Sequence, residues 1–143
     1  MVILEFFEKS RKYSNLIDNL AYWKLQNKEL NGISDLLFEA LKIRKEINNS
    51  TAIVGSYIHL SEYYQRENDI SKSIEYSNYA LNTAKKSKIP TNIVLALKQA
   101  SIVDVKRSPT YSREYIRISD SLQIAERNSK DRFARLQLET DEI

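Results

Sequence analysis

The chain has no cysteine, one histidine, two glycines and two prolines among its 143 residues. Without cysteine there is no disulfide, no thiolate nucleophile and no cysteine-ligated zinc. A single histidine, His59, excludes a cluster of histidine metal ligands, and we expect it to be an ordinary, partly exposed side chain. Two widely separated glycines exclude a glycine-rich phosphate-binding loop. We therefore expect a protein that is not an enzyme and that holds no metal or cofactor.

Long apolar runs are also missing, since none approaches the roughly 18 residues needed to span a bilayer. The first residues, MVILEFFEKSRK, place apolar side chains before charged ones, which is the reverse of a secretory signal. The net charge is +3, and the lysines and arginines are scattered along the chain. This pattern does not indicate nucleic-acid binding. We expect no membrane span in this chain, and its composition leaves the compartment open.

Helix-forming residues dominate what is present. Hydrophobic residues make up 42% of the chain and charged residues 29%, which suits a folded domain with a core. Because glycine and proline are so few, the composition predicts an all-α chain, and the length fits one domain spanning residues 1–143.

The clearest periodicity lies between Ser50 and Lys88, where small or apolar residues recur at helical spacing on both sides of a turn-prone segment. The first run is Tyr57, Leu60, Ser61 and Tyr64, and the second is Ile70, Ser73, Ile74, Ser77, Ala80, Leu81 and Ala84. The segment Arg66–Asp69 separates them, and Asp69 or Ser71 is placed to cap the second helix. This pattern predicts a helical hairpin, which needs similar neighbours to bury both its faces.

Further helices are expected on both sides of this hairpin. Before it we expect a short helix over Val2–Lys12, a second over Asn15–Glu29 and a third over Ile33–Asn48. The second would bury Leu16, Leu20 and Trp23. After the hairpin we expect a helix over Thr91–Val105, a turn at Lys106–Thr110, and a long helix from Tyr111 to the chain end, with Ile118, Ser121, Leu122, Ala125, Phe133 and Leu136 facing inward.

A repeat links these segments. Ala40-Leu41, Ala80-Leu81 and Ser121-Leu122 occupy equivalent places, 40 and 41 residues apart. Small residues at such places let two helices approach closely. Helix–turn–helix units at this period indicate an α-solenoid of about three hairpins with terminal helices. The expected units are 14–49, 51–88 and 91–127, followed by a helical extension over 128–143.

The middle unit resembles a tetratricopeptide repeat (TPR). The matching residues are Tyr57, Leu60, Ser61, Tyr64, the turn Asn68-Asp69, Ser73, Ser77, Ala80 and Leu81. Serine replaces the preferred residue at three of these positions, and the spacing is about 40 rather than 34 residues. The resemblance implies a right-handed superhelix whose concave groove, lined by the first helix of each hairpin, binds a peptide or partner protein.

The last segment resembles the end of the TPR sensor region in signalling proteins of Bacteroidetes-type bacteria. The matching residues are Glu126, Arg127, Phe133, Ala134, Arg135, Glu139, Thr140 and Asp141. In that family the segment precedes a membrane-spanning helix and then a histidine kinase or a LuxR-type DNA-binding domain, neither of which this chain contains. The resemblance implies an excised sensor region, periplasmic if it holds and cytoplasmic otherwise.

Groove-facing positions of the repeat are the candidate partner-binding residues. They are Lys24 in the first unit, Glu62, Gln65 and Arg66 in the second, and Lys98, Gln99 and Lys106 in the third. The lysines and arginine could bind a peptide carboxylate or acidic side chain through charge-assisted hydrogen bonds. The alternative is that all seven are solvated surface residues.

Two further side-chain sets have alternative interpretations. Phe133, Leu136, Thr140 and Ile143 form a seam at 3-4-3 spacing, which indicates either a helix that pairs across a homodimer and transmits motion or a helix that caps the last repeat. The aromatic patch consists of Tyr57, Tyr63, Tyr64, Tyr76 and Tyr79. Packing between helices is the favoured role of the patch, and stacking on nucleic-acid bases is the alternative.

The sequence thus predicts a non-catalytic sensor or protein-interaction module of a bacterial signalling protein. The competing hypothesis is a structural scaffold of helical repeats that self-associates through its open ends. Either kind of protein exposes an apolar end face, so self-association is expected in both cases.

Overall fold

The computed structural model describes residues 2–142, which form six α-helices and no strand. They are α1 (Val2–Gln26), α2 (Ile33–Glu46), α3 (Ser50–Arg66), α4 (Ile70–Ser87), α5 (Pro90–Val103) and α6 (Ser108–Asp141). The predicted all-α class is confirmed. The central hairpin α3–α4 begins and ends close to the positions that its apolar periodicity predicts.

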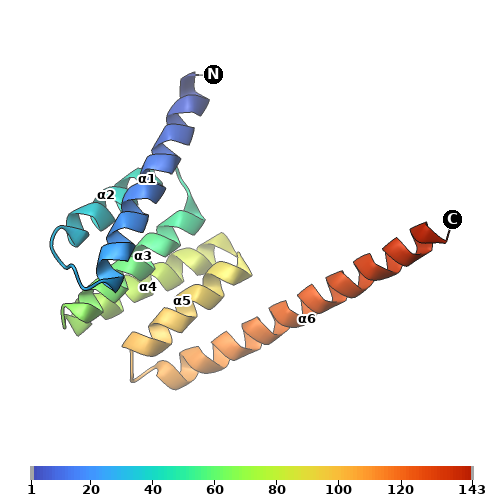
Figure 1. Cartoon of the computed structure of the whole chain (residues 1–143). Helices are drawn as coiled ribbons and strands as arrows, with labels where there is room; N and C mark the ends of the chain where they lie inside the picture. Colours follow the sequence, from blue (N-terminus) through green and yellow to red (C-terminus); the bar gives the residue numbers. More distant parts are fainter. Residues whose placement is uncertain (1, 143) are drawn as a thin grey trace.

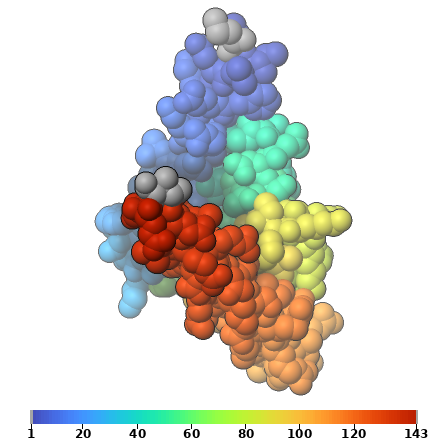
Figure 2. Space-filling view, turned by 90° about the vertical axis from the view of Figure 1, so that its right-hand side faces the viewer, coloured from blue at the N-terminus to red at the C-terminus, as the bar shows by residue number. Residues whose placement is uncertain are grey.

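Each helix packs mainly against its neighbours in the sequence (Figure 1). The pairs α1–α2, α3–α4 and α5–α6 are hairpins, and α2–α3 and α4–α5 join one hairpin to the next. Within residues 2–142, the remaining helix contacts are α3 with α5 and α1 with α3, which are the first helices of successive hairpins. The N-terminal part of α1 projects beyond the other helices (Figures 1 and 2).

The connections between helices repeat every 20 residues. Lys28, Asn48, Asn68 and Lys88 follow α1 to α4, and each has a left-handed backbone with φ of 60°, 53°, 61° and 57° respectively. After α1, α2 and α3, the next residue donates its backbone N–H to a carbonyl five positions earlier. This is the Schellman geometry, which satisfies the carbonyls at a helix C-terminus. The 40-residue sequence repeat therefore contains two 20-residue structural units, each made of one helix and the connection that follows it.

Side-chain caps begin the two helices of the central hairpin. Asn49 accepts from the backbone N–H of Ala52, and Asp69 accepts from that of Lys72, both at 3.1 Å. Asp69 is thus the cap of α4, one of the two residues expected for that role. A cap of this kind contributes about 1 kcal/mol.

Two clusters of buried side chains form the core. One joins α1, α2 and α3, and consists of Ala21, Leu25, Ile33, Leu37, Leu41 and Leu60. The other joins α3 to α6, and consists of Val54, Ala80, Leu81, Ala84, Ala96, Leu97, Ala100 and Tyr111. Most interior positions expected for α3 and α4 are confirmed, but Ile70, at the start of α4, is 48% exposed and does not face inward.

The expectation for the first helices was wrong. Val2–Lys12 and Asn15–Glu29 belong to one continuous helix, α1. Leu16, Leu20 and Trp23 are 66%, 44% and 55% exposed. The buried face of α1 is a different one, on which two polar residues lie among apolar ones: Ser14, Ile17, Asp18, Ala21 and Leu25. The apolar stripe points the other way, where no helix of the described chain lies against it.

The end of α6 also differs from expectation. Tyr111 is buried, and Ile118 and Leu122 are half-buried, but every residue from Gln123 to Glu142 is exposed. The helix continues past the N-terminal end of α5 and away from the other helices (Figure 1). Ser121, Ala125, Phe133 and Leu136 therefore do not face inward, and the interpretation of the extension as a cap on the last hairpin is wrong. Thr140 is also exposed, while Ile143 lies outside the described residues.

Candidate functional site

An open depression lies between α3 and α5, and it brings four of the seven predicted partner-binding residues together. Glu62, Gln65 and Arg66 line it from α3, and Gln99 and Ile102 line it from α5. Its volume is about 460 Å³. The spacing of the repeat explains this result, because α3 and α5 are first helices of successive hairpins and pack side by side. We call this depression the α3–α5 site.

A buried polar network fixes the floor of the α3–α5 site. The amide nitrogen Nε2 of Gln99 donates to Ser61 Oγ at 3.0 Å. Ser61 and Ser73 donate to each other's backbone carbonyls at 2.8 and 2.7 Å, which ties α3 to α4. Gln99 is itself buried, so it holds three helices together and is not free for a partner, contrary to its predicted role.

Charge in the α3–α5 site is of both signs. Burial raises the pKa of the Glu62 carboxyl, while His59, Arg66 and Lys98 act on it in the opposite direction. Arg66 and Lys98 are exposed, and neither forms an ion pair with a residue between 2 and 142. Two unpaired cations beside one half-buried carboxylate favour a ligand that carries negative charge.

The other three predicted residues do not line the α3–α5 site. Lys98 is exposed on α5, and its charge acts on the Glu62 carboxyl. Lys24 is half-buried near the C-terminus of α1, and Lys106 is exposed in the connection between α5 and α6. Neither lines the α3–α5 site. The prediction assigned Lys24 and Lys106 to the positions in the repeat that correspond to groove residues of α3. However, no hairpin of the described chain packs before α1, and α5 ends at Val103, before Lys106.

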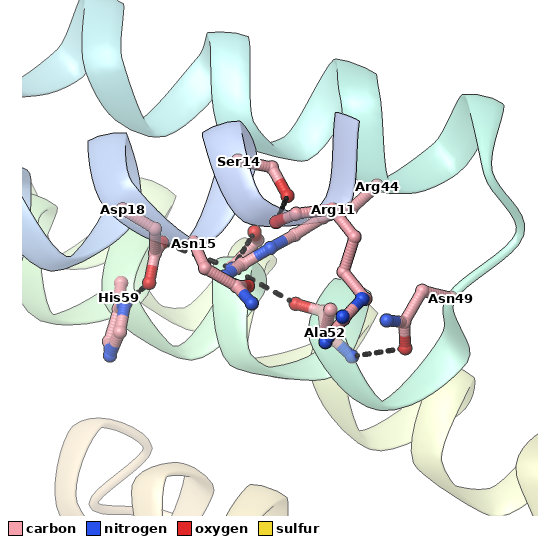
Figure 3. Close-up of polar contacts among 9 residues, drawn as sticks. Arg11, Ser14, Asn15, Asp18, Arg44, Asn49, Ala52 and His59 are labelled. Atoms are coloured by element: carbon pink, nitrogen blue, oxygen red, sulfur yellow. Dashed lines mark hydrogen bonds and ion pairs between the residues drawn. The ribbon is translucent and has the colours of Figure 1, made fainter. Parts of the chain in front are cut away.

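A second polar constellation joins α1, α2 and α3, and Figure 3 shows it. Arg44 Nη1 lies 3.2 Å from Asp18 Oδ1 and donates to Ser56 Oγ at 2.8 Å. Its other nitrogen, Nη2, donates to Asn15 Oδ1 at 3.0 Å. Both Asp18 and Arg44 are buried, so this ion pair is shielded from water. We call it the Asp18–Arg44 junction.

His59 lies at the edge of this junction. Its Nδ1 is 3.0 Å from Asp18 Oδ2, and its ring stacks on Tyr22 with centroids 4.5 Å apart. His59 is partly exposed, as expected, and it lies beside the buried Asp18–Arg44 ion pair. A signal was present in the sequence, because Asp18 follows Ser14 by four residues on the face of α1 that includes Ala21 and Leu25.

The Asp18–Arg44 junction has the properties of a structural element. Neither Asp18 nor Arg44 lines the α3–α5 site, and in the part of the chain that the structure describes no group of three or more histidines and carboxylates is arranged to hold a metal ion. A buried ion pair contributes little net stability but is costly to break on one side only. The junction therefore fixes how α1 and α2 dock on α3.

The predicted aromatic patch packs between α3 and α4, the two helices of the central hairpin. Tyr64 and Tyr76 stack with centroids 5.5 Å apart and planes 6° apart, and Tyr57 contacts both Tyr76 and Tyr79. Lys45 lies 5.5 Å from the Tyr57 ring centroid, and Lys72 lies 5.0 Å from that of Tyr64. Lysines thus occupy positions over two of the rings that base stacking would need.

A larger depression, of about 710 Å³, lies beside the projecting part of α1. It is lined by Leu4, Phe7, Glu8, Arg11, Ile47, Asn48, Asn49, Ser50, Thr51 and Ile89. One of its walls is the start of α1, whose residues from Val2 to Lys9 are all exposed, so this wall is not held by other helices. We therefore consider the α3–α5 site the better candidate for binding.

Across residues 2–142, no helix combines the length and the hydropathy needed to cross a membrane. No protein-family model, curated protein or solved structure matches the chain.

Proposed function

We propose that the chain is a TPR-like α-solenoid that binds an acidic peptide or partner protein at the α3–α5 site. The observation that carries this proposal is a pair of exposed cations without an ion-pair partner in the described chain. Arg66 lines the site, and Lys98 lies on α5, close enough to act on the charge of Glu62. Hydrogen bonds among Gln99, Ser61 and Ser73 hold the floor of the site in place, so a ligand does not have to reorganise it.

Several features support the solenoid arrangement. Hairpins contact only their neighbours, and the left-handed turn residues recur every 20 positions. Ser61 and Ser73, at positions where a TPR prefers glycine and alanine, are fully buried where α3 meets α4. Small residues at this crossing are what a stacked helical repeat requires.

The chemistry of the α3–α5 site suggests the ligand class. Arg66 and Lys98 would bind a carboxylate through charge-assisted hydrogen bonds, and the exposed Ile102 would contact an apolar side chain next to it. Glu62 would accept from a peptide N–H, and the same carboxylate would repel a ligand whose negative charge came too close. A peptide with a free carboxyl group next to an aliphatic residue fits this arrangement.

A role in signalling is the second part of the proposal. The resemblance of residues 120–143 to the end of a bacterial TPR sensor region supports it, with α6 as the coupling helix. Tyr111, Tyr115 and Ile118 pack on the rest of the molecule, and the same face of α6 continues to Phe133 and Leu136. A rotation of the last hairpin would therefore turn the exposed end of one rigid helix.

Peptide binding to the purified chain tests the ligand class. We expect fluorescence polarisation to detect peptides with a free C-terminal carboxylate and weaker binding of the same peptides as amides. Arg66→Ala and Lys98→Ala should each weaken binding by about tenfold or more, since a hydrogen bond to a charged group is worth ~1.5–3 kcal/mol. Lys86→Ala, an exposed lysine of α4, is the matched control. Equal loss in all three variants, or no preference for the carboxylate, would contradict the proposal.

A scaffold that assembles through its ends is the second candidate function. It is favoured by the apolar stripe of Leu16, Leu20 and Trp23 on the outer face of α1. Light scattering on the isolated chain separates the two candidates, because a peptide-binding module does not need to form large assemblies. Open-ended growth with concentration would support the scaffold, and a closed species would count against it.

A further inference from the structure

The outer face of α1 carries a heptad pattern that becomes visible once α1 is seen as one helix. Its a and d positions follow at alternating steps of four and three residues. They are Val2, Phe6, Lys9, Tyr13, Leu16, Leu20 and Trp23. All seven are exposed, and six of them are large apolar side chains. Three heptads with one polar member is the pattern of a helix that pairs with another helix.

The same position in the next hairpin is fully covered. Leu60 lies 40 residues after Leu20, in the equivalent place on α3, and it is completely buried against α1 and α2. Leu20 remains 44% exposed because no hairpin of the described chain packs on that side of α1. The face is therefore a packing surface by its place in the repeat, not a solvated surface that happens to be apolar.

We propose that this face pairs with the α1 helix of a second copy, antiparallel, to form a two-fold symmetric dimer. In that register Phe6 packs against Trp23 of the second copy, Lys9 against Leu20, and Tyr13 against Leu16, and the same layers recur in reverse order. Each copy presents one surface to itself, so the contact closes at two chains and does not grow.

Lys9 decides between the two possible orientations. In a parallel pair, Lys9 of both copies would meet in the centre of the seam, and the two charges would repel. In the antiparallel pair, the methylene stem of Lys9 lies along Leu20 while its ammonium group reaches water. A single lysine in a seam is a known means of specifying register at some cost in stability. Antiparallel helix dipoles add a small favourable term.

The area of the face matches what a dimer needs. Phe6 and Tyr13 are 58% and 47% exposed. Together with Leu16, Leu20 and Trp23 they leave on the order of 500 Å² of apolar surface in water, given roughly 150–250 Å² for a whole aromatic side chain. Since a homodimer interface is about 65% apolar, this corresponds to nearly 800 Å² per partner, the size of a stable interface.

This pairing uses the same apolar stripe of α1 as the second candidate function, but it closes at two chains and is therefore distinct from open-ended assembly. It does not involve the α3–α5 site. Its first test is the mass in solution by light scattering and sedimentation over a range of concentrations. The parent should have twice the chain mass of 16.7 kDa. Leu16→Glu and Leu20→Glu should each give 16.7 kDa with an unchanged circular dichroism spectrum, because both side chains are exposed and outside the buried core.

Phe133→Glu/Leu136→Glu is the control, since these two residues form the other exposed apolar seam. The pairing of α1 predicts that this variant stays dimeric. A dimer lost in the α6 variant but kept in Leu20→Glu would overturn the α1 pairing and support a dimer through α6. A parent chain that remains a monomer at all concentrations would overturn it as well.

Cysteine trapping tests the orientation, because the chain has no cysteine of its own. A mixture of Lys9→Cys and Leu20→Cys chains should form a disulfide-linked dimer under mild oxidation. Lys9→Cys alone should not, since antiparallel pairing separates the two copies of that position by about three helical turns. A disulfide in Lys9→Cys alone would overturn the antiparallel register. Peptide binding by Leu20→Glu should stay within twofold of the parent, so failure of the dimer and failure of the α3–α5 site are distinguishable.

Discussion

Two oppositely charged residues are paired in the interior of this protein. Asp18 and Arg44 lie where α1, α2 and α3 meet, and their ion pair is hidden from water. Removing one partner leaves the other without compensation, which costs about 3–5 kcal/mol, while replacing both by apolar residues of similar volume is often neutral. The two outcomes differ enough to separate a structural junction from a surface ion pair.

We expect Asp18→Asn and Arg44→Met each to lower the free energy of unfolding by about 3 kcal/mol. The double variant Asp18→Leu/Arg44→Met should lose less than either single change, because no charge is left buried. Urea unfolding followed by circular dichroism measures all three. Losses that simply add would show that Asp18 and Arg44 are not coupled.

The Glu62 carboxyl gives a pH prediction. Burial raises its pKa above the ordinary value of 4.5, so the folded state disfavours the ionised form. The contribution of Glu62 to stability is therefore full below the pKa of the unfolded chain and is lost as pH rises through the higher pKa of the folded state.

Glu62→Gln should stabilise the protein by about 0.5 kcal/mol at neutral pH, and the gain should vanish on acidification. Unfolding free energies of parent, Glu62→Gln and the exposed control Glu67→Gln across this pH range provide the measurement. A gain for Glu62→Gln that does not change with pH would contradict the cause given.

At the scale of single helices, the turn residues determine where α1 to α4 end. Four non-glycine residues adopt a left-handed backbone at 20-residue intervals, and two of them are lysines. A left-handed backbone costs a residue with a Cβ atom roughly 1–2 kcal/mol, which glycine avoids. The asparagines at the other two positions tolerate this conformation better.

Lys88→Gly should therefore stabilise the protein by about 0.5–1 kcal/mol after the greater flexibility of glycine in the unfolded chain is included. Lys42→Gly, an exposed lysine in the interior of α2, is the matched control and should destabilise by about 1 kcal/mol. Chemical unfolding of both variants beside the parent checks the signs. Destabilisation in both would mean that the backbone at Lys88 is not left-handed.

The buried residues are predicted best for helices that have other helices packed on both sides. Leu60, Ala80 and Leu81 were placed inside correctly because the central hairpin is covered from both directions. Leu20 and Trp23 were placed inside wrongly, since periodicity identifies an apolar stripe but not whether another helix covers it. Each stripe has the same pattern in sequence, and only the arrangement of helices separates them.

The candidate site could be predicted in part for the same reason. The repeat frame brought Glu62, Gln65, Arg66 and Gln99 to one depression, because α3 and α5 are related by the 40-residue period. The hydrogen bond from Gln99 to Ser61 could not be predicted, since the burial of the Gln99 side chain depends on which side of α5 faces α3. Asp18 and Arg44 were missed because they are 26 residues apart, and because the face of α1 that carries Asp18 was not the one expected to turn inward.

At the scale of the whole molecule, the two ends of the helix array differ. At one end, α1 presents a heptad face next to a packed body. At the other, residues 123–142 of α6 are exposed on all sides and make no contact with the preceding helices. An isolated helix of this length is only marginally stable in water. The core therefore does not depend on the end of α6, although the helix depends on its attachment to the core.

Truncation after Arg127 should consequently change the free energy of unfolding by less than about 0.5 kcal/mol, as for changes outside the core. It should leave both peptide binding and the α1 dimer unchanged. In the full chain, amide hydrogen exchange should be fast from Gln123 onward and slow in α3 and α4, because opening of an uncovered helix requires little free energy. Protection of residues 128–142 that depends on protein concentration would show instead that α6 pairs between copies. That result would place the coupling helix, not α1, at the centre of the assembly.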